Sequence, residues 1–365
     1  MRAISAKVIR QLLASGGAPI DPNLVPVREY KLDYETVDPY GFPIMASGVV
    51  FVPQGLTNPL PLLCDQHGTI FLKNFVESQD TDVDLGRLWG SEGGDAMFFA
   101  TSGYVTLMPD YLGMGDSPGF QTYVHSKTEA TAVVDMLRAA KTFCASNGIA
   151  LNSQLFLMGY SQGGLATMAA HREIEALHSN EFTVTASAPM AAPYDFAGTT
   201  LHYWLAATNY GGSAYVAQVL AALLPIYHFA DTLEELFAAP FNRTVAPLLD
   251  GKHDFKAVNA LCPASPLAIL RADYLESLRN NPMDPIRLAL RDNDLYEWTP
   301  RSPIRLFHCQ GDEIIPYTNS MVAYRSFTDR GACCVEVVDP GPPGAGHGNC
   351  QSVLAAKVWL DSLKR

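Results

Sequence analysis

The sequence lacks two features that would connect it to a membrane or a nucleic acid. It contains no stretch of about 18 uninterrupted apolar residues, the length that a transmembrane helix needs. It also contains no run of Lys or Arg, and 25 basic against 37 acidic residues give a formal net charge of −12. An acidic chain repels phosphate backbones and anionic lipid headgroups. We therefore expect neither a nucleic-acid partner nor stable insertion into a membrane.

The N-terminus lacks the pattern of a signal peptide. Ala3–Ser15 is interrupted by Lys7, Arg10 and Gln11, and this spacing predicts a short amphipathic helix instead. A secreted protein from which the signal peptide had been removed would have the same N-terminus. The sequence thus leaves open a secreted, periplasmic or cytoplasmic location.

Cysteine is sparse and irregularly spaced. The number of cysteines, seven, is odd, and their spacing matches no disulfide framework. No CxxC pattern or paired Cys/His spacing suggests zinc, so we expect no metal site. Buried free thiols are expected, and one or two disulfides stay open. The cysteines are Cys64, Cys144, Cys262, Cys309, Cys333, Cys334 and Cys350.

The remaining composition fits a large folded protein, and the order of its elements predicts the α/β class. Hydrophobic residues make up 48% of the 365 and charged residues 17%, which is too little charge for a disordered chain. Two hairpin strands are followed by alternating strands and helices, an order that predicts a mostly parallel sheet with helices on both faces. The predicted strands are Tyr30–Val37, Ile44–Pro53, Leu60–Asp65, Tyr104–Pro109, Gln154–Gly159, Phe182–Pro189, Ile304–Cys309 and Cys334–Val338, and the predicted helices are Ser126–Phe143, Gln162–Leu177, Thr318–Arg330 and Asn349–Leu363.

One segment interrupts this alternation. Residues 196–303 contain helical stretches and many aromatic residues but no convincing strand. An all-helical insertion between two strands of an α/β sheet is typical of a lid or cap over an active site, although a separate structural domain would look the same. We therefore divide the chain into a core of residues 1–195 and 304–365 and a cap of residues 196–303. Tyr203 and Trp204 of the cap are expected to contact an apolar substrate group.

A nucleophile motif lies between a strand and a helix. Residues 159–163 read Gly-Tyr-Ser-Gln-Gly, directly after the apolar run Leu-Phe-Leu-Met. A GxSxG pattern is weak alone, but the strand-turn-helix setting is that of a nucleophile elbow. The turn would raise the Ser161 hydroxyl above the sheet edge, and the helix N-terminus would favour negative charge there. We predict that Ser161 is the nucleophile and add its neighbour Tyr160 to the expected substrate contacts.

A serine nucleophile needs a histidine base, which follows the acid in the chain order of hydrolases built on such an elbow. Of the nine histidines, only His308 and His347 follow the cap. His308 falls inside a predicted strand and is expected to be a packed core residue. His347 lies in a Gly/Pro-rich loop after the last strand, where it can reach the elbow. We predict that His347 is the base.

The acid is expected just past the strand that ends at Cys309. Asp312 follows a glycine there and could accept a hydrogen bond from the second ring nitrogen of the histidine. Asp195, at the end of an earlier strand, is the rival acid. We favour Asp312, and we expect Asp195 to cap a turn and Glu313 to point to solvent.

The tetrahedral intermediate of such a reaction needs two backbone donors. We predict the amide of Gln162, which follows the nucleophile, and the amide of Thr69, in the Gln-His-Gly-Thr loop after the third strand. His67 in this loop is expected to be buried and to hold the loop by hydrogen bonds next to the substrate. Tyr111, in the glycine-rich loop after the fourth strand, is expected to line the substrate site.

Together these motifs resemble a known family. GYSQGG, QHGT, DYLGMGDS, the late Gly-Asp pair and the final Gly-His-Gly are similar to motifs of the α/β-hydrolase superfamily. More narrowly, they resemble the secretory-lipase-like esterases of the Candida antarctica lipase A type and their bacterial relatives, from about Tyr30 to the end. The resemblance implies an α/β-hydrolase fold, carboxylic-ester hydrolysis, no metal or other cofactor, and frequent secretion. Carried over, the family's triad falls on Ser161, Asp312 and His347.

The sequence therefore predicts a serine ester hydrolase whose partner is a small-molecule ester. Short to medium acyl esters with apolar groups are the expected substrates. Long-chain acylglycerols and aryl or hydroxycinnamoyl esters are the alternatives for the same chemistry. A peptidase, an acyltransferase and an inactive binding protein are the alternatives for the same fold. The oligomeric state stays open.

Overall fold

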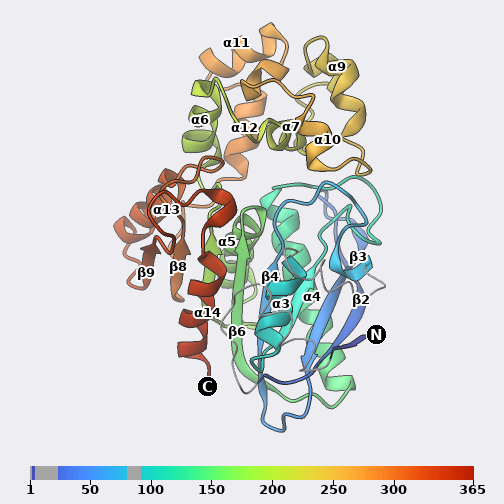
Figure 1. Ribbon diagram of the computed structural model, residues 1–365, viewed down its shortest axis with the longest axis vertical. Coiled ribbons are helices and arrows are strands. Elements are labelled where there is room, and N and C mark those ends of the chain that lie inside the picture. The colour runs from blue at the N-terminus through green and yellow to red at the C-terminus, as the bar shows by residue number, and fades with distance from the viewer. Residues whose placement is uncertain (1, 5–23, 80–91) are drawn as a thin grey trace.

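A single mixed β-sheet forms the centre of the protein (Figure 1). The computed structural model describes residues 2–4, 24–79 and 92–365. From edge to edge, the strands of the described residues are β1 (Arg2–Ile4), β2 (Val27–Val37), β3 (Pro43–Pro53), β5 (Val105–Pro109), β4 (Leu60–Gln66), β6 (Leu151–Tyr160), β7 (Val184–Met190), β8 (Ile304–Phe307) and β9 (Val335–Val338).

The sheet is antiparallel at one side and parallel over the rest. β1, β2, β3 and β5 pair antiparallel in that order, and β5, β4, β6, β7, β8 and β9 are all parallel neighbours. Each strand predicted from the sequence is present, with shifted ends. β8 is shorter than predicted and ends at Phe307, so His308 and Cys309 follow the strand instead of lying in it.

Helices cover both faces of the sheet, as the predicted alternation requires. Glu92–Ala100, which has two glycines in a short helix, was not among the predicted elements. The helical elements outside residues 196–303 are η1 (Glu77–Gln79), α3 (Glu92–Ala100), α4 (Ser126–Ser146), α5 (Gln162–Leu177), α13 (Thr318–Asp329), η5 (His347–Asn349) and α14 (Ser352–Leu363).

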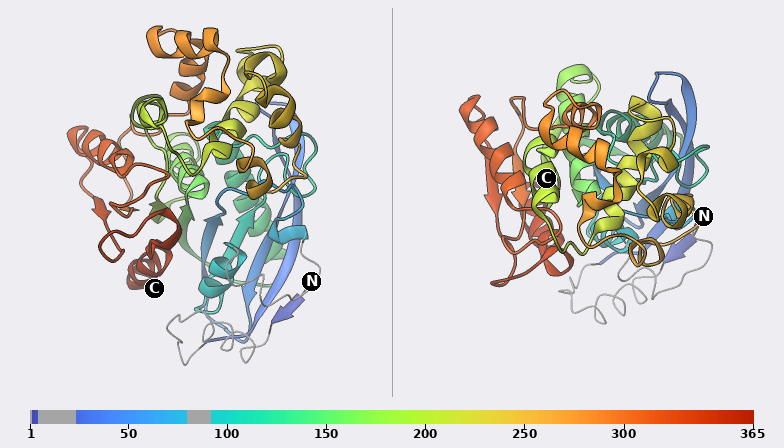
Figure 2. Two further views of the ribbon diagram at one scale, coloured as in Figure 1. Left: turned by 45° about the horizontal axis from the view of Figure 1, so that its top comes forward. Right: turned by 90° about the horizontal axis from the view of Figure 1, so that it is seen from above.

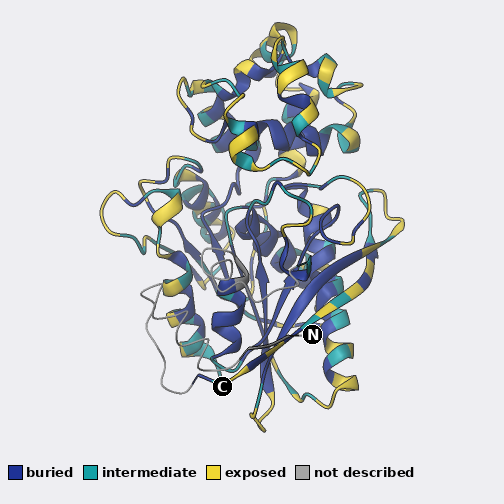
Figure 3. Ribbon diagram, turned by 45° about the vertical axis from the view of Figure 1, so that its right-hand side comes forward, coloured by how far each residue is buried: buried dark blue, intermediate teal, exposed yellow. Residues whose placement is uncertain are grey.

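The period of two along the central strands decides which helix each side chain meets. Leu62 and Cys64 of β4 pack with α4 and α5, whereas Leu63 between them packs on the opposite face with α3 and α14. Both faces of the central strands are apolar because both are covered, and Figure 3 shows these strands buried along most of their length.

The predicted helix over Ala3–Ser15 is wrong where it can be checked. Ala3 and Ile4 lie in strand β1, paired with Arg28 and Val27 of β2. Residues 5–15 of that prediction lie outside the described residues.

In the part of the chain that the structure describes, no helix combines the length and the apolar character needed to cross a bilayer.

Residues 196–303, which are described throughout, are helical and contain one isolated β-bridge, between Phe237 and Leu270. They gather at one end of the sheet, and the view from above shows them over that end (Figures 1 and 2). Their apolar side chains share one cluster with α5 and α13, so this segment is packed onto the core. Its elements are η2 (Phe196–Thr200), α6 (Leu201–Ala206), α7 (Ser213–Tyr227), α8 (Leu233–Leu236), α9 (Phe241–Thr244), η3 (Ala246–Leu248), α10 (Phe255–Asn259), η4 (Pro266–Ile269), α11 (Ala272–Asn280) and α12 (Pro285–Asp292).

Candidate active site

The turn between β6 and α5 holds Ser161 in a strained conformation. Its φ and ψ are 58° and −118°, a region that non-glycine residues rarely adopt. Its backbone N–H donates a hydrogen bond to the carbonyl oxygen of Met190 in β7 (2.9 Å), which holds the turn against the sheet. This geometry is the nucleophile elbow that the sequence predicts.

Glycines beside Ser161 are required by close backbone approach. A Cβ at Gly163 would overlap the carbonyl oxygen of Gln66, and one at Gly164 would overlap that of Met190. At Gly159 a Cβ would meet the carbonyl oxygens of Gly163 and Gln66. The motif therefore contains glycine where α5 crosses close to the ends of β4 and β7.

The three residues predicted as a triad lie together. His347 Nε2 is 3.1 Å from Ser161 Oγ, and His347 Nδ1 is 2.6 Å from Asp312 Oδ2. The other carboxylate oxygen of Asp312 accepts hydrogen bonds from the backbone N–H groups of Ile314 (2.9 Å) and Ile315 (2.8 Å). The carboxylate thus contacts the nitrogen of His347 that faces away from the serine, as the role predicted for Asp312 would require.

Asp312 is ionised although it is buried. Burial by itself raises the pKa of its carboxyl, but hydrogen bonds from His308 and His347 outweigh burial and hold the pKa well below its usual range. An ionised carboxylate at this point accepts the Nδ1–H of His347 and selects the tautomer whose Nε2 lone pair faces Ser161.

The rival acid Asp195 caps a helix and does not contact His347 through any hydrogen bond found in the described residues. Its carboxylate accepts hydrogen bonds from the backbone N–H groups of Gly198 (3.0 Å) and Thr199 (2.8 Å) at the start of η2, so it is a helix cap. Glu313 is exposed, as expected, and its Oε2 also accepts a hydrogen bond from the backbone N–H of His347 (3.0 Å).

A second Ser–His–carboxylate arrangement shows why Ser161 is distinctive. His171 lies 2.7 Å from Ser187 Oγ through Nδ1 and 3.1 Å from Glu175 Oε1 through Nε2. His171 and Ser187 have no exposed surface, so no substrate can reach that serine. Ser161 is partly exposed and lines a cavity.

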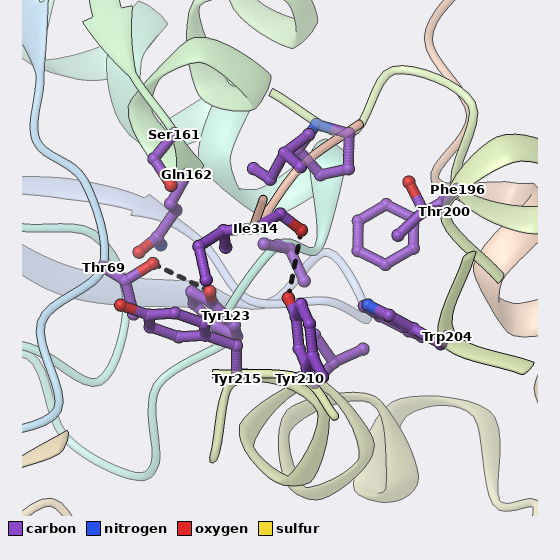
Figure 4. A pocket seen from close by; sticks show the side chains of 14 residues that line it. Thr69, Tyr123, Ser161, Gln162, Phe196, Thr200, Trp204, Tyr210, Tyr215 and Ile314 are labelled. Atoms are coloured by element: carbon purple, nitrogen blue, oxygen red, sulfur yellow. Dashed lines mark hydrogen bonds between the residues drawn. The ribbon is translucent and has the colours of Figure 1, made fainter. Parts of the chain in front are cut away.

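The cavity beside Ser161 is small and mainly apolar, with a volume of about 30 Å³ (Figure 4). Core and cap residues share its wall, and the Thr69 hydroxyl is hydrogen-bonded to that of Tyr123 (2.8 Å). The lining residues are Thr69, Tyr123, Val124, Ser161, Gln162, Pro193, Phe196, Thr200, Trp204, Tyr210, Tyr215, Val219, Ile314 and Ile315.

Two of the expected substrate contacts have other partners. Tyr160 donates a hydrogen bond from its hydroxyl to the carbonyl oxygen of His347 (2.6 Å), and the two rings pack with centroids 5.0 Å apart. The hydroxyl of Tyr203 donates to the carbonyl oxygen of Glu313 (2.8 Å). Neither residue lines the cavity, whereas Trp204 does. A substrate contact by Tyr160 or Tyr203 stays a prediction.

His67, in the loop after β4, and Tyr111, in the loop after β5, do not line the cavity. Each is 1% exposed, and their rings pack with centroids 4.3 Å apart. The ring nitrogens of His67 lie 2.7 Å from the carbonyl oxygen of Gly68 and 3.1 Å from that of Asp110. Burial lowers the pKa of His67, so the neutral ring donates to one of these oxygens and braces the loop that carries Thr69. Direct contact of His67 or Tyr111 with substrate stays a prediction.

Gln162 begins α5, and its side chain turns away to a buried carboxyl group. Its Nε2 donates to Glu129 Oε1 (2.7 Å), and the same oxygen accepts from the backbone N–H of Val124 (3.0 Å). Glu129 thus joins two residues that line the cavity, through a contact that no sequence motif indicated.

Several cavity residues were missed by motif reasoning, because they come from turns and from the cap. Tyr123 and Val124 precede α4, and Val124 has a positive φ of 53°. Of these, Ile314 and Ile315 had the clearest sequence signal, because they lie only two and three residues after Asp312. Tyr210 belongs to the aromatic cap, and its hydroxyl donates to the carbonyl oxygen of Ile314 (3.1 Å).

Comparison with known proteins identifies a family and several relatives of known structure. Residues 97–189 match the secretory lipase family. The crystal structure of the rice cell wall degrading esterase LipA from Xanthomonas oryzae is 30% identical with a TM-score of 0.84, and the alignment covers 100% of this chain and 93% of that one. A putative hydrolase from Legionella pneumophila is 25% identical, with a TM-score of 0.86 and coverage of 100% and 96%. No curated protein matches the sequence.

Candida antarctica lipase A has the same fold at 18% identity, with a TM-score of 0.68 and coverage of 95% of this chain and 77% of the lipase. The mostly parallel sheet flanked by helices is therefore that of an α/β-hydrolase. The chain belongs to the secretory-lipase-like family of α/β-hydrolases and is a hydrolase of the esterase/lipase type.

Proposed function

We propose that the protein is a serine carboxylic-ester hydrolase that acts on short to medium acyl esters through an acyl-enzyme. The observation that carries this proposal is the hydrogen-bonded path from Ser161 through His347 to Asp312, with the serine facing a cavity. The esterase and lipase relatives support the same reaction class.

In this mechanism His347 Nε2 takes the proton of the Ser161 hydroxyl as its oxygen attacks the ester carbonyl carbon. Asp312 accepts the Nδ1–H of His347 and stabilises the imidazolium that forms. The amides of Gln162 and Thr69 donate to the oxyanion. His347 then gives the proton to the departing alcohol, and the acyl group stays on Ser161. Water, activated by the same imidazole, releases the acid.

The cavity supports the preference for short acyl groups. Its volume of about 30 Å³ is far below the ~300–1,000 Å³ of typical ligand sites. The aromatic wall offers a place for a small apolar group and no counter-charge for an anion. A long acyl chain would require displacement of cap residues such as Trp204 or Val219.

We further propose that residues 196–303 act as a lid. Two tyrosines of this segment are hydrogen-bonded to the loop that carries the acid, Tyr203 to the carbonyl oxygen of Glu313 (2.8 Å) and Tyr210 to that of Ile314 (3.1 Å). Opening the lid would break both bonds, widen the cavity and admit the substrate.

A p-nitrophenyl ester series from acetate to palmitate tests the proposal. Ser161→Ala is expected to lose on the order of a millionfold in kcat. Ser187→Ala is the matched control, because it removes the serine of the other Ser–His–carboxylate set, and it is expected to retain turnover. Activity that survives Ser161→Ala would overturn the proposal.

The same assays separate the alternatives. A maximum at long acyl chains would make the protein a lipase, and a maximum with aryl or hydroxycinnamoyl esters would place it with esterases of aromatic acids. Turnover of amides would identify a peptidase, and transfer to added alcohol in preference to water an acyltransferase. No turnover of any ester would favour an inactive binding protein.

A further inference from the structure

A second histidine contacts the carboxylate of Asp312. His308 follows β8, and its side chain is wholly buried. Its Nε2 lies 3.2 Å from Asp312 Oδ2, the oxygen that also faces His347 Nδ1. One carboxylate oxygen is thus shared by two imidazole rings.

The surroundings of His308 determine its tautomer. Nε2 also lies 3.0 Å from the carbonyl oxygen of Ile315, which can only accept a hydrogen bond. Nε2 therefore carries the hydrogen, which it directs at the Ile315 carbonyl and at Asp312. Nδ1 then has a lone pair and accepts from the hydroxyl of Ser320 in α13 (2.8 Å). Ser320 is also fully buried, so water does not compete for this bond.

With His308 included, the Asp312 carboxylate is fully satisfied. Oδ1 accepts from the backbone N–H groups of Ile314 and Ile315, and Oδ2 is hydrogen-bonded to His347 Nδ1. The Nε2–H of His308, which is hydrogen-bonded to the Ile315 carbonyl, approaches Oδ2 to 3.2 Å as the fourth polar contact, and a carboxylate has roughly four lone-pair sites. The terminal torsion of an aspartate is broad when nothing holds it, so donors on both oxygens are what aim this group.

We propose that His308, held by Ser320, is a positioning residue that keeps Asp312 Oδ2 directed at His347 Nδ1. This inference rests on the proposed function, because it assigns His308 a task only if Asp312 acts on His347 during turnover. It goes beyond the expected packed core residue, since His308 is buried but its Nε2–H is directed at the reacting set.

Loss of the Nε2–H would have two consequences for Asp312. Its orientation would broaden, which lowers the fraction of molecules with His347 correctly placed. Its oxygen would also carry more negative charge towards the imidazolium of His347, so the protonated, inactive form would persist to higher pH. Tyr203 and Tyr210 also interact electrostatically with Asp312, and the Glu313 carboxylate accepts a hydrogen bond from the backbone N–H of His347.

The chain offers a matched control in His171. That histidine is equally buried and has the same partner types, a serine hydroxyl at Nδ1 and a carboxylate at Nε2. Its carboxylate partner, Glu175, accepts from the backbone N–H groups of Arg301 and Ser302 instead of from His347. Replacing His171 therefore reproduces the cost of losing a buried histidine without touching Asp312.

The experiment compares His308→Leu, His308→Gln and Ser320→Ala with His171→Leu and Ser187→Ala. Tm, kcat, KM and the pH profile of kcat/KM are measured with one p-nitrophenyl ester. We expect His308→Leu to lower kcat by about tenfold to a hundredfold, as for a misplaced reacting group, with KM little changed. The acid limb of its profile should move to higher pH. His308→Gln, whose amide nitrogen can donate in place of Nε2, should recover most of the loss in kcat.

Equal behaviour of His308→Leu and His171→Leu, with lower Tm but unchanged kcat and acid limb, would overturn the inference. If His308→Leu does not fold, Ser320→Ala decides. A kcat below that of Ser187→Ala supports the inference, and an equal kcat overturns it. Ser161→Ala in the same assay keeps the two proposals distinct, because its inactivity upholds the proposed function whatever the His308 variants do.

Discussion

The disulfide between Cys309 and Cys350 joins the two loops that carry Asp312 and His347. Cys309 lies three residues before Asp312, and Cys350 lies three residues after His347. The sequence left one or two disulfides open, and the pairing follows from the loops meeting at the edge of the sheet. We predict that breaking this bond lowers both stability and turnover.

The expected loss of stability follows from the length of chain that the bond closes. For a separation of 41 residues, loop-closure entropy corresponds to about 4 kcal/mol of stabilisation at 25 °C. An unfolding entropy of ~2.1 cal/mol/K per residue gives about 0.77 kcal/mol/K for 365 residues. The removal of the bond is therefore expected to lower Tm by about 5 °C.

Turnover should fall as well, because the bond lies between the acid and the base. A displacement near 1 Å among reacting groups costs up to ~10²-fold in rate. At temperatures below Tm, we therefore expect kcat to drop by about tenfold or more, with a smaller change in KM. The assay is thermal unfolding and p-nitrophenyl ester kinetics on Cys309→Ser/Cys350→Ser.

Cys333→Ser/Cys334→Ser is the matched control, because these cysteines are exposed and not disulfide-bonded. Surface substitutions stay within ~0.5 kcal/mol, which here is less than about 1 °C in Tm. If both double variants have the same Tm, the entropic reasoning is refuted. If Cys309→Ser/Cys350→Ser keeps the wild-type kcat, the disulfide is not needed to hold Asp312 and His347 at the correct distance.

Asp312→Asn is expected to lower kcat by about 10⁴-fold, because an amide cannot hold the required histidine tautomer. Asp195→Asn, which alters only a helix cap, should leave kcat near wild type, and equal losses in the two variants would contradict the choice of acid. Tyr160→Phe removes one hydrogen bond to His347 but keeps the ring contact, so kcat should fall by about fivefold; an unchanged kcat would show that the hydroxyl does not position the histidine. Burial raises the pKa of Glu129 from 4.5 to about 8. The folded state then binds more protons than the unfolded state across that window, so this group's contribution to stability is lost as pH rises from 4.5 to 8. Glu129→Gln should flatten that loss in urea unfolding midpoints, and an unaltered slope would contradict it.

Much of the fold could be predicted because its signals are local. One run with a period of two and several nearly continuous apolar runs, separated by turns or by helical periods, predicted the eight strands from β2 to β9. The elbow around Ser161 was also predictable, because its glycines are required within a few residues of the serine. His347 and Asp312, which the structure places together beside Ser161, were predicted from chain order, which is a property of the linear sequence.

The tertiary structure alone decided which side chains contact the polar groups of the site. His308 and Tyr160 were both given other expectations from the sequence, yet one contacts Asp312 and the other contacts His347. Tyr160 and His347 are separated by 187 residues, and only the order β6, β7, β8, β9 brings their loops to one edge. Periodicity reports which face of an element is buried, whereas the partner of a buried polar atom depends on strand order, register and loop path. Those are collective properties of the whole folded chain.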